Sequence, residues 1–184
     1  MKLVQYILCI PLTLVVTLLA YLLSPILPFF VDDLTGDLPN FLRWFETPDA
    51  PCVGDAMWKN RTVGMSRYKQ IFLWLLRNPA QGLDAWLKAD INLADPVRVY
   101  GDINVRTGNS YHAINSELWK GKGGWLFVTG SGYFNFLGII PLGGHCVYSE
   151  FGWRLRGIAD GEPSEICKQF VFTPLRVAKF YKGD

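Results

Sequence analysis

Residues 3–31 read LVQYILCIPLTLVVTLLAYLLSPILPFFV, a stretch without a single charged side chain. A helix needs about 20 mainly apolar residues to cross the roughly 30 Å hydrocarbon core of a bilayer. A secretory signal peptide has a shorter apolar region, of about 7–15 residues, and a small-residue cleavage site that this stretch matches poorly. We therefore predict a retained transmembrane anchor in residues 1–31. Its spanning helix covers residues 3–23, tolerates Pro11 and ends before Pro25.

The charges on either side of the apolar stretch bear on its orientation. Lys2 precedes it, whereas Asp32, Asp33 and Asp37 follow it. Cytoplasmic flanks of membrane helices are enriched in Lys and Arg, so Lys2 favours a cytoplasmic N-terminus and a body outside the cytoplasm. The basic stretch that starts at Lys59 favours the opposite orientation, and a single lysine does not decide between the two.

The composition argues against several classes of function. The net charge is only +2, which gives no strong field for nucleic acid, so we expect no nucleic-acid partner. The four cysteines include no pair with C-x-x-C spacing, so we predict no metal site and no cofactor. Cys146 and Cys167 are the candidate pair for a disulfide in an oxidising compartment, and they stay thiols in a reducing one.

Residues 32–65 form a predicted connector that is rich in Gly, Pro, Asp and Asn. Most of its short sequences are typical of turns, while residues 38–45 favour a short helix. The aromatic side chains of Phe29, Phe30 and Trp44 are predicted at a membrane interface, where Trp is enriched. Packing of these rings on the body of the protein is the alternative, and the sequence does not choose between them.

Residues 66–95 are predicted to be helical and amphipathic. Apolar side chains recur at helical spacing in residues 66–77, with cations on the other side. Asn78 and Pro79 are predicted to cap and begin a second short helix with Leu83, Trp86 and Leu87 on one face. The membrane-interface side chains predicted in this segment are Phe72, Trp74, Arg67 and Lys69. The alternative is that this segment covers one side of a sheet.

From residue 96 to residue 184 the hydrophobic period changes to two, which is typical of strands with one buried face. Strands are predicted over residues 97–106, 112–119, 125–129, 133–140, 147–155 and 169–173, with a basic tail over residues 176–182. No helical pattern separates these strands, so neighbours are expected to be antiparallel. The predicted fold class is α+β: a single N-terminal transmembrane helix, short amphipathic helices, then an antiparallel β-meander or small open barrel.

Three carboxylates of the connector, Glu46, Asp49 and Asp55, are the candidates for acid–base chemistry or calcium binding. They lie in turn-forming sequences, without the regular ligand spacing of a calcium loop. His145 and Cys146 suggest a nucleophile and its base, but adjacent residues on a strand point to opposite faces. We therefore predict no catalytic residue, and a protein that is not an enzyme.

Three sequence blocks in a fixed order resemble a family of small, uncharacterised bacteriophage and prophage membrane proteins. The blocks are LRWFETPD at residues 42–49, LLRNPA at residues 75–80 and FGWRL at residues 151–155, and they follow an apolar N-terminus. The resemblance covers most of the chain and implies a viral origin and a bacterial host membrane. It implies no catalytic residue.

These observations lead to one main hypothesis and two alternatives. In the main hypothesis the chain is a non-enzymatic phage protein of the host inner membrane, with a cytoplasmic N-terminus and a periplasmic β body. That body binds a host-envelope or phage protein during lysis, assembly or superinfection exclusion, and homo-oligomers stay open. The first alternative is a virion component whose apolar N-terminus is buried in an assembly or inserts into the host membrane. The second is an envelope-acting hydrolase that uses the connector carboxylates.

Overall fold

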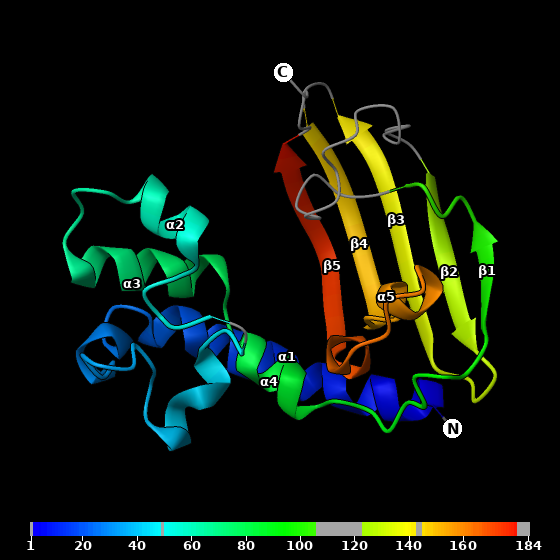
Figure 1. Cartoon of the computed structure of the whole chain (residues 1–184), viewed down its shortest axis with the longest axis horizontal. Coiled ribbons are helices and arrows are strands. Elements are labelled where there is room, and N and C mark those ends of the chain that lie inside the picture. Colours follow the sequence, from blue (N-terminus) through cyan, green and yellow to red (C-terminus); the bar gives the residue numbers. More distant parts are fainter. Residues whose placement is uncertain (1, 49, 106–122, 143–144, 180–184) are drawn as a thin grey trace. The chain divides into compact units, whose positions relative to one another are not determined.

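The computed structural model describes residues 2–48, 50–105, 123–142 and 145–179 (Figure 1). The chain forms two compact units. Val4–Leu87 make up the first, which we call the helical unit, and Met1–Leu3 with Lys88–Asp184 make up the second, the sheet unit. The helical unit therefore joins the predicted anchor, the connector and most of the predicted amphipathic segment in one body.

The apolar stretch forms one continuous helix, α1 (Lys2–Leu23), with Pro11 inside it. Its 22 residues rise about 33 Å in total. The helix ends where the sequence predicts: the Ser24 N–H donates to the Ala20 carbonyl at 2.9 Å, and a 3₁₀ turn, η1 (Leu27–Phe30), follows. Within the described residues, α1 is the one helix that is long and apolar enough to cross a membrane.

Four further short helices belong to the helical unit: η2 (Asn40–Phe45), α2 (Ala56–Arg61), α3 (Arg67–Arg77) and α4 (Gln81–Trp86). α3 confirms the predicted amphipathic helix, and the Ser66 hydroxyl caps it by accepting a hydrogen bond from the Lys69 N–H at 3.4 Å. The sequence analysis does not predict α2. It begins after Asp55, whose carboxylate accepts from the Trp58 N–H at 2.7 Å. An Asp before a helix-forming run is the N-cap signal that identifies such a helix.

The predicted start of the second short helix is wrong. Asn78 ends α3, with its N–H donating to the Trp74 carbonyl at 3.0 Å, and does not cap α4. Ala80 has a left-handed backbone with φ of 57°, so a helix cannot run through it and α4 starts one residue later. Leu83 is fully buried, as the predicted face requires, but Trp86 is 61% exposed.

The core of the helical unit draws side chains from α1, η1, η2, α3 and α4 and from the loops between α1 and α2. Its buried members are Val16, Ala20, Leu27, Val31, Leu38, Phe45, Cys52, Ile71, Leu75, Ala80 and Leu83. Burial stabilises the fold by roughly 1.5–3 kcal/mol for each large aliphatic or aromatic side chain. Because Val16 and Ala20 belong to α1, the apolar helix supplies part of this core and is packed against the rest of the helical unit.

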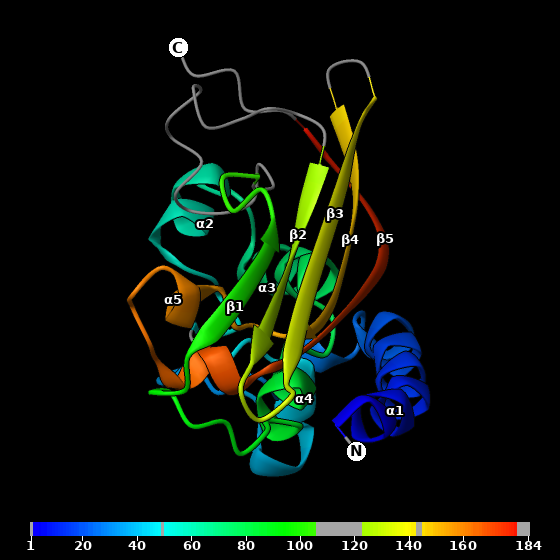
Figure 2. The same ribbon diagram turned by 90° about the vertical axis from the view of Figure 1, so that its right-hand side faces the viewer.

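The sheet unit contains one open sheet of five strands in the order β1-β2-β3-β4-β5, and every neighbouring pair is antiparallel (Figure 1). The strands are β1 (Val97–Gly101), β2 (Gly123–Thr129), β3 (Phe134–Leu142), β4 (His145–Trp153) and β5 (Phe170–Lys179). Figure 2 shows how these strands twist relative to one another, as strands of L-residues do. Each described strand pairs with its neighbour in sequence, so the predicted α+β class is confirmed, and the described strands form an open antiparallel meander.

The strand boundaries differ from the sequence analysis by up to two residues in β2, β3 and β4, and by more in β1 and β5. The strand predicted over residues 97–106 stops at Gly101, which has φ of 91°. A turn then starts at Asp102, whose carboxylate accepts from the Asn104 N–H at 3.0 Å. β5 is longer than predicted and takes in the first part of the predicted basic tail. The strand predicted over residues 112–119 lies outside the described residues.

One face of the sheet is covered by the segment that follows β4. Trp125 and Phe127 of β2 are buried on this face, and the Arg156 guanidinium lies over their rings at 5.6 and 5.8 Å. Arg156 begins the short helix α5 (Arg156–Ala159), and the turn η4 (Glu165–Lys168) leads into β5. Cation–π contacts of this kind help to hold α5 on the sheet.

The opposite face has a row of phenylalanine rings across three neighbouring strands. Phe136, Phe151 and Phe172 occupy paired positions, with consecutive ring centroids 6.2 and 5.8 Å apart. On the same face, Ile140 is 65% exposed and Val177 is 60% exposed. We call these five residues the phenylalanine face.

Candidate functional site

Helix α1 has one packed face and one exposed apolar face. Val16 and Ala20 lie in the core of the helical unit. Leu8, Val15 and Leu22 are 71%, 56% and 64% exposed, and their spacing of seven residues places them along one side of the helix. Large exposed apolar surfaces mark contact with a partner or a membrane. This line of side chains is the first part of a candidate lipid-contact surface.

Exposed apolar side chains continue beyond the end of α1. The residues, which we call the apolar belt, are Ile26, Phe29, Phe30, Leu34, Phe41, Trp44 and Trp86. The rings of Trp44 and Trp86 lie 5.3 Å apart, so η2 and α4 together present an exposed tryptophan pair. Exposed Phe and Trp beside a long apolar helix are typical of the edge of a bilayer.

The sequence analysis identifies three members of the apolar belt, Phe29, Phe30 and Trp44, and misses four. Leu34 and Phe41 are 96% and 77% exposed, but the sequence analysis assigns Leu34 to a turn-rich connector and Phe41 to a short helix over residues 38–45, without an interface role. Trp86 is predicted only to share a helix face with Leu83 and Leu87. A local signal does exist for Phe41, which lies three residues before Trp44 on η2, the spacing that brings two side chains to one side of a short helix.

The first turn of α3 is fixed beside the end of α1. The Tyr68 hydroxyl donates to the carbonyl of Pro25, two residues beyond α1, at 2.8 Å. The Tyr68 ring lies 5.3 Å from the ring of Phe29 and 6.2 Å from that of Phe72, between ring centroids. These contacts place the N-terminal end of α3 at the level where the apolar helix stops.

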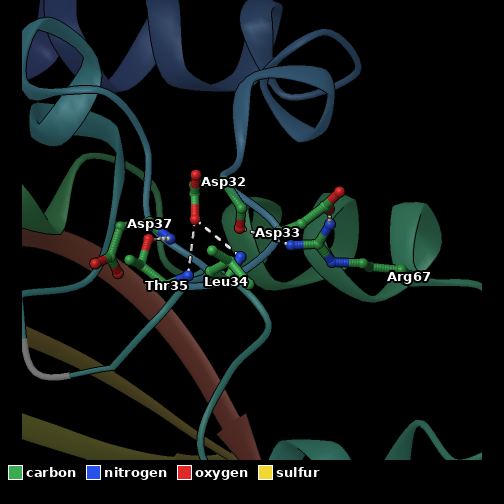
Figure 3. Close-up of polar contacts among 6 residues, drawn as sticks. All are labelled: Asp32, Asp33, Leu34, Thr35, Asp37 and Arg67. Atoms are coloured by element: carbon green, nitrogen blue, oxygen red, sulfur yellow. Dashed lines mark hydrogen bonds and ion pairs between the residues drawn. The ribbon is translucent and has the colours of Figure 1, made fainter.

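A tight turn over residues 32–37 completes this attachment (Figure 3). The Asp32 carboxylate accepts hydrogen bonds from the N–H groups of Leu34 and Thr35, each at 2.8 Å. These hydrogen bonds hold the pKa of Asp32 below its usual range, and the bond from the Thr35 N–H has the larger effect. Arg67 of α3 donates to the Asp32 carbonyl at 2.8 Å and forms an ion pair with Asp33, toward which its guanidinium points in Figure 3.

The structure divides the interface residues predicted on α3. Lys69 is exposed, and Phe72 is half-buried against Tyr68. Arg67 is committed to the turn at residues 32–37. Trp74 is only 4% exposed and packs at 5.5 Å from the ring of Trp58, so it belongs to the interior of the helical unit and not to its surface. The amphipathic pattern of residues 66–77 does not show that Trp74 is buried. Trp58, which packs against it, lies on α2, and the sequence analysis does not predict that helix.

The connector carboxylates that lie in the described residues make contacts within the helical unit. Glu46 accepts from the Leu38 N–H at 2.9 Å and forms an ion pair with Arg43 at 3.5 Å. Asp55 caps α2. Asp49 lies outside the described residues. In the described part of the chain, no group of three His, Cys, Asp or Glu side chains could hold a metal ion.

Burial raises the pKa of Glu46, and the charge of Asp37 adds to this effect. The folded chain therefore takes up this proton at a higher pH than the unfolded chain. The free energy of unfolding of the helical unit should thus rise as the pH falls through the folded pKa toward the ordinary Glu value of about 4.3. Glu46→Gln keeps an oxygen for the Leu38 N–H without the charge. We expect this variant to be more stable than the natural chain at pH 7 and to lose that advantage near pH 4.

Urea unfolding in detergent micelles at both pH values measures this difference. Glu162→Gln, at an exposed position of the sheet unit, makes the same chemical change outside the helical unit and is the matched control, which should leave the stability of the helical unit unchanged. A Glu46→Gln chain that is less stable than the natural chain at pH 7 would contradict the proposed cost of burying the charge.

No disulfide joins Cys146 and Cys167. Cys146 lies near one end of β4, about 23 Å along the strand from Trp153 at the other end. Cys167 lies three residues before Phe170, the partner of Trp153, and three residues span at most about 10 Å. The two Cα atoms therefore stay well beyond the roughly 7 Å limit for a disulfide. The structure does not bring this candidate pair together, because the meander separates the two residues.

Cys52 is a further buried thiol, in the core of the helical unit. Burial raises its pKa to about 12, and the charges of Glu46 and Asp37 add to the effect. Since the thiolate is the nucleophile, we expect no reaction of Cys52 with a maleimide at pH 8 in the folded chain and full reaction in denaturant. Peptide mass spectrometry after timed labelling checks this result. Rapid modification of Cys52 in the folded chain would contradict the packing described above.

The described residues thus define a class: an α+β protein with one N-terminal helix long and apolar enough to span a membrane and an open antiparallel sheet. Residues 1–179 match a family described as "Family of unknown function (DUF7338)", and the chain belongs to that family. No curated protein and no solved structure matches the chain.

Proposed function

We propose that this protein is a non-enzymatic, single-pass membrane protein whose sheet unit binds a partner protein. The observation that supports membrane anchoring best is the set of exposed apolar side chains in one compact unit. They lie on one side of α1 and in the apolar belt. In water this surface would favour aggregation, whereas in a bilayer it faces acyl chains and the interface.

The proposed membrane geometry follows from lengths. A helix of about 33 Å matches a hydrocarbon core of roughly 30 Å. Val16 lies seven residues before the end of α1, about 10 Å along the axis, and is buried by its own unit. The helical unit then enters the outer part of the bilayer around the last turns of α1. The apolar belt lies at this depth, where monotopic proteins bury apolar side chains by about 5–10 Å.

The proposed location is a bacterial inner membrane with the N-terminus in the cytoplasm. Lys2 supports this orientation, and the bacteriophage origin rests on the resemblance of the three sequence blocks. Protease treatment of cells with only the outer membrane opened tests the orientation through a C-terminal tag. Digestion of the tag supports a periplasmic location of residues 88–184, and protection supports a cytoplasmic location of the same residues.

The phenylalanine face is the proposed partner-binding surface. Its exposed Ile140 and Val177 flank stacked aromatic rings, and aromatic side chains are enriched at protein interfaces. A photo-crosslinking amino acid at Ile140 should yield a defined adduct with a protein in membranes of the natural host. The same group at Glu162, an exposed position outside this face, is the control and should yield none. Absence of an adduct at both Ile140 and Val177 would contradict this surface.

A further inference from the structure

We propose that the turn between α2 and α3, with the cations beside it, binds the headgroups of anionic phospholipids. This inference rests on the proposed anchoring by α1 and adds a lipid-binding site to it. The turn covers residues 62–66, and we call it the basic turn together with Lys59, Arg61 and Lys69.

The charge around this turn is one-sided. Between Asp55 and Asp84 the sequence has no acidic residue, but it has Lys59, Arg61, Arg67, Lys69 and Arg77. Of these, Lys59, Arg61 and Lys69 are exposed and lie within a few residues of the turn. A cluster of cations at a membrane surface attracts anionic lipids, and each cation contributes a factor of roughly five in binding.

The tip of the turn is apolar and exposed. Val63 is 80% exposed and Met65 is 37% exposed. Gly64, between them, has φ of 83°, and no atom would lie within 4 Å of a Cβ at that position. An apolar tip between cations suits an interface in which acyl chains lie just below phosphate groups. Nucleic acids and acidic proteins would supply negative charge for the cations but no acyl chains for the apolar tip. Anionic lipid supplies both, so we take lipid as the ligand of this turn.

The turn is held in one shape by contacts between α2 and α3. The Gln70 side-chain amide donates to the Thr62 hydroxyl at 3.0 Å, and the Trp58 indole donates to the Gln70 carbonyl at 3.3 Å. The Thr62 N–H in turn donates to the Trp58 carbonyl at 3.0 Å. A preformed turn loses little conformational entropy when it binds a headgroup.

The contacts of α3 place this turn near the end of the apolar helix. Arg67 donates to the Asp32 carbonyl, and Tyr68 donates to the carbonyl of Pro25, two residues after α1. Val63 lies four residues before Arg67, so their Cα atoms are at most about 14 Å apart. The headgroup layer on each side of the hydrocarbon core is about 5–8 Å thick. With α1 across the bilayer, the basic turn therefore lies within reach of the headgroups.

The test uses the full chain reconstituted in vesicles of phosphatidylcholine, with or without phosphatidylglycerol. Val63→Cys is labelled with the environment-sensitive dye NBD, and the natural chain is treated identically to measure labelling of its own cysteines. We expect blue-shifted emission and quenching by lipids with a nitroxide at headgroup depth in the vesicles that contain phosphatidylglycerol. Without that lipid, the quenching should fall several-fold.

Charge variants separate specific binding from general attraction. Arg61→Gln/Lys69→Gln should lose most of the dependence on phosphatidylglycerol, by roughly the five-fold factor for each cation. Arg98→Gln/Arg176→Gln removes the same charge from exposed positions of the sheet unit and should keep the dependence.

The outcomes distinguish this inference from the proposed anchoring. A chain that resists extraction with alkaline carbonate while NBD at Val63 stays in a water-like environment overturns the lipid site and leaves the anchor. Equal quenching in both kinds of vesicle overturns the role of anionic headgroups. A chain that carbonate extracts overturns the proposed anchoring, and the lipid site with it.

Discussion

Placing aspartate at both Leu8 and Val15 is expected to abolish stable membrane integration while the helical unit stays folded. Both side chains are exposed on the same side of α1, so neither substitution removes a contact of the core. An Asp near the middle of a membrane helix costs about 2.5–3.5 kcal/mol of insertion free energy. Two such residues cost about 5–7 kcal/mol, which shifts the insertion equilibrium by more than a thousand-fold.

Alkaline carbonate extraction measures integration, and protection of Cys52 from maleimide measures folding of the helical unit. Leu8→Ala/Val15→Ala is the matched control, since it shortens the same side chains without adding charge, and it should stay in the membrane pellet. Deletion of residues 1–30 is a poorer test, because it would also remove Val16, Ala20 and Leu27 from the core. A double aspartate variant that still resists carbonate would show that α1 does not span the bilayer.

Gly152→Ala is expected to lower the free energy of unfolding of the sheet unit strongly. Gly152 lies in β4 between its partners Asn135 and Val171, with φ of 113°. A Cβ at this position would come within 2.1 Å of the Phe134 carbonyl oxygen, which is backbone and cannot move aside. A residue with a Cβ pays about 1–2 kcal/mol for the left-handed backbone and about 1–3 kcal/mol for the forced overlap. Together these costs lower the free energy of unfolding of the sheet unit by about 2–5 kcal/mol.

Urea unfolding in micelles, followed through the labelling of Cys146 and Cys167, measures this loss. Both thiols are buried in the sheet unit, while Cys52 reports on the helical unit in the same experiment. Gly130→Ala is the matched control, because Gly130 lies in the turn after β2 with open space around its Cβ position. A Gly152→Ala chain as stable as this control would contradict the backbone conformation described for β4.

Patterns within a short stretch were sufficient for much of the fold. The uninterrupted apolar residues of α1 and the helical spacing of α3 identify both helices, because each pattern repeats within a few turns. The alternation in β2, β3 and β4, with glycine-rich turns between strands, identifies an antiparallel meander. Strands with alternating burial that are joined by tight turns can pair readily only with their neighbours in sequence, in antiparallel orientation.

The misplaced boundaries depend on backbone conformations that no local pattern reveals. The left-handed Ala80 delays α4, and the turn after Gly101 shortens β1, although the hydrophobic alternation continues beyond it. At Ala80 and at Gly101, packing in the surrounding fold outweighs the helix or strand preference of the local sequence.

The sequence by itself determined that the chain begins with one long apolar helix and continues to an antiparallel sheet, because periodicity and charge are properties of neighbouring residues. Only the tertiary structure decided which apolar side chains are buried. Trp74 and Trp86 both read as parts of an apolar helix face, yet Trp58 covers the first and the second stays exposed beside Trp44. Exposure depends on which distant segment packs against a side chain, and contacts such as that of Tyr68 with Pro25 form only when the chain folds back on α1.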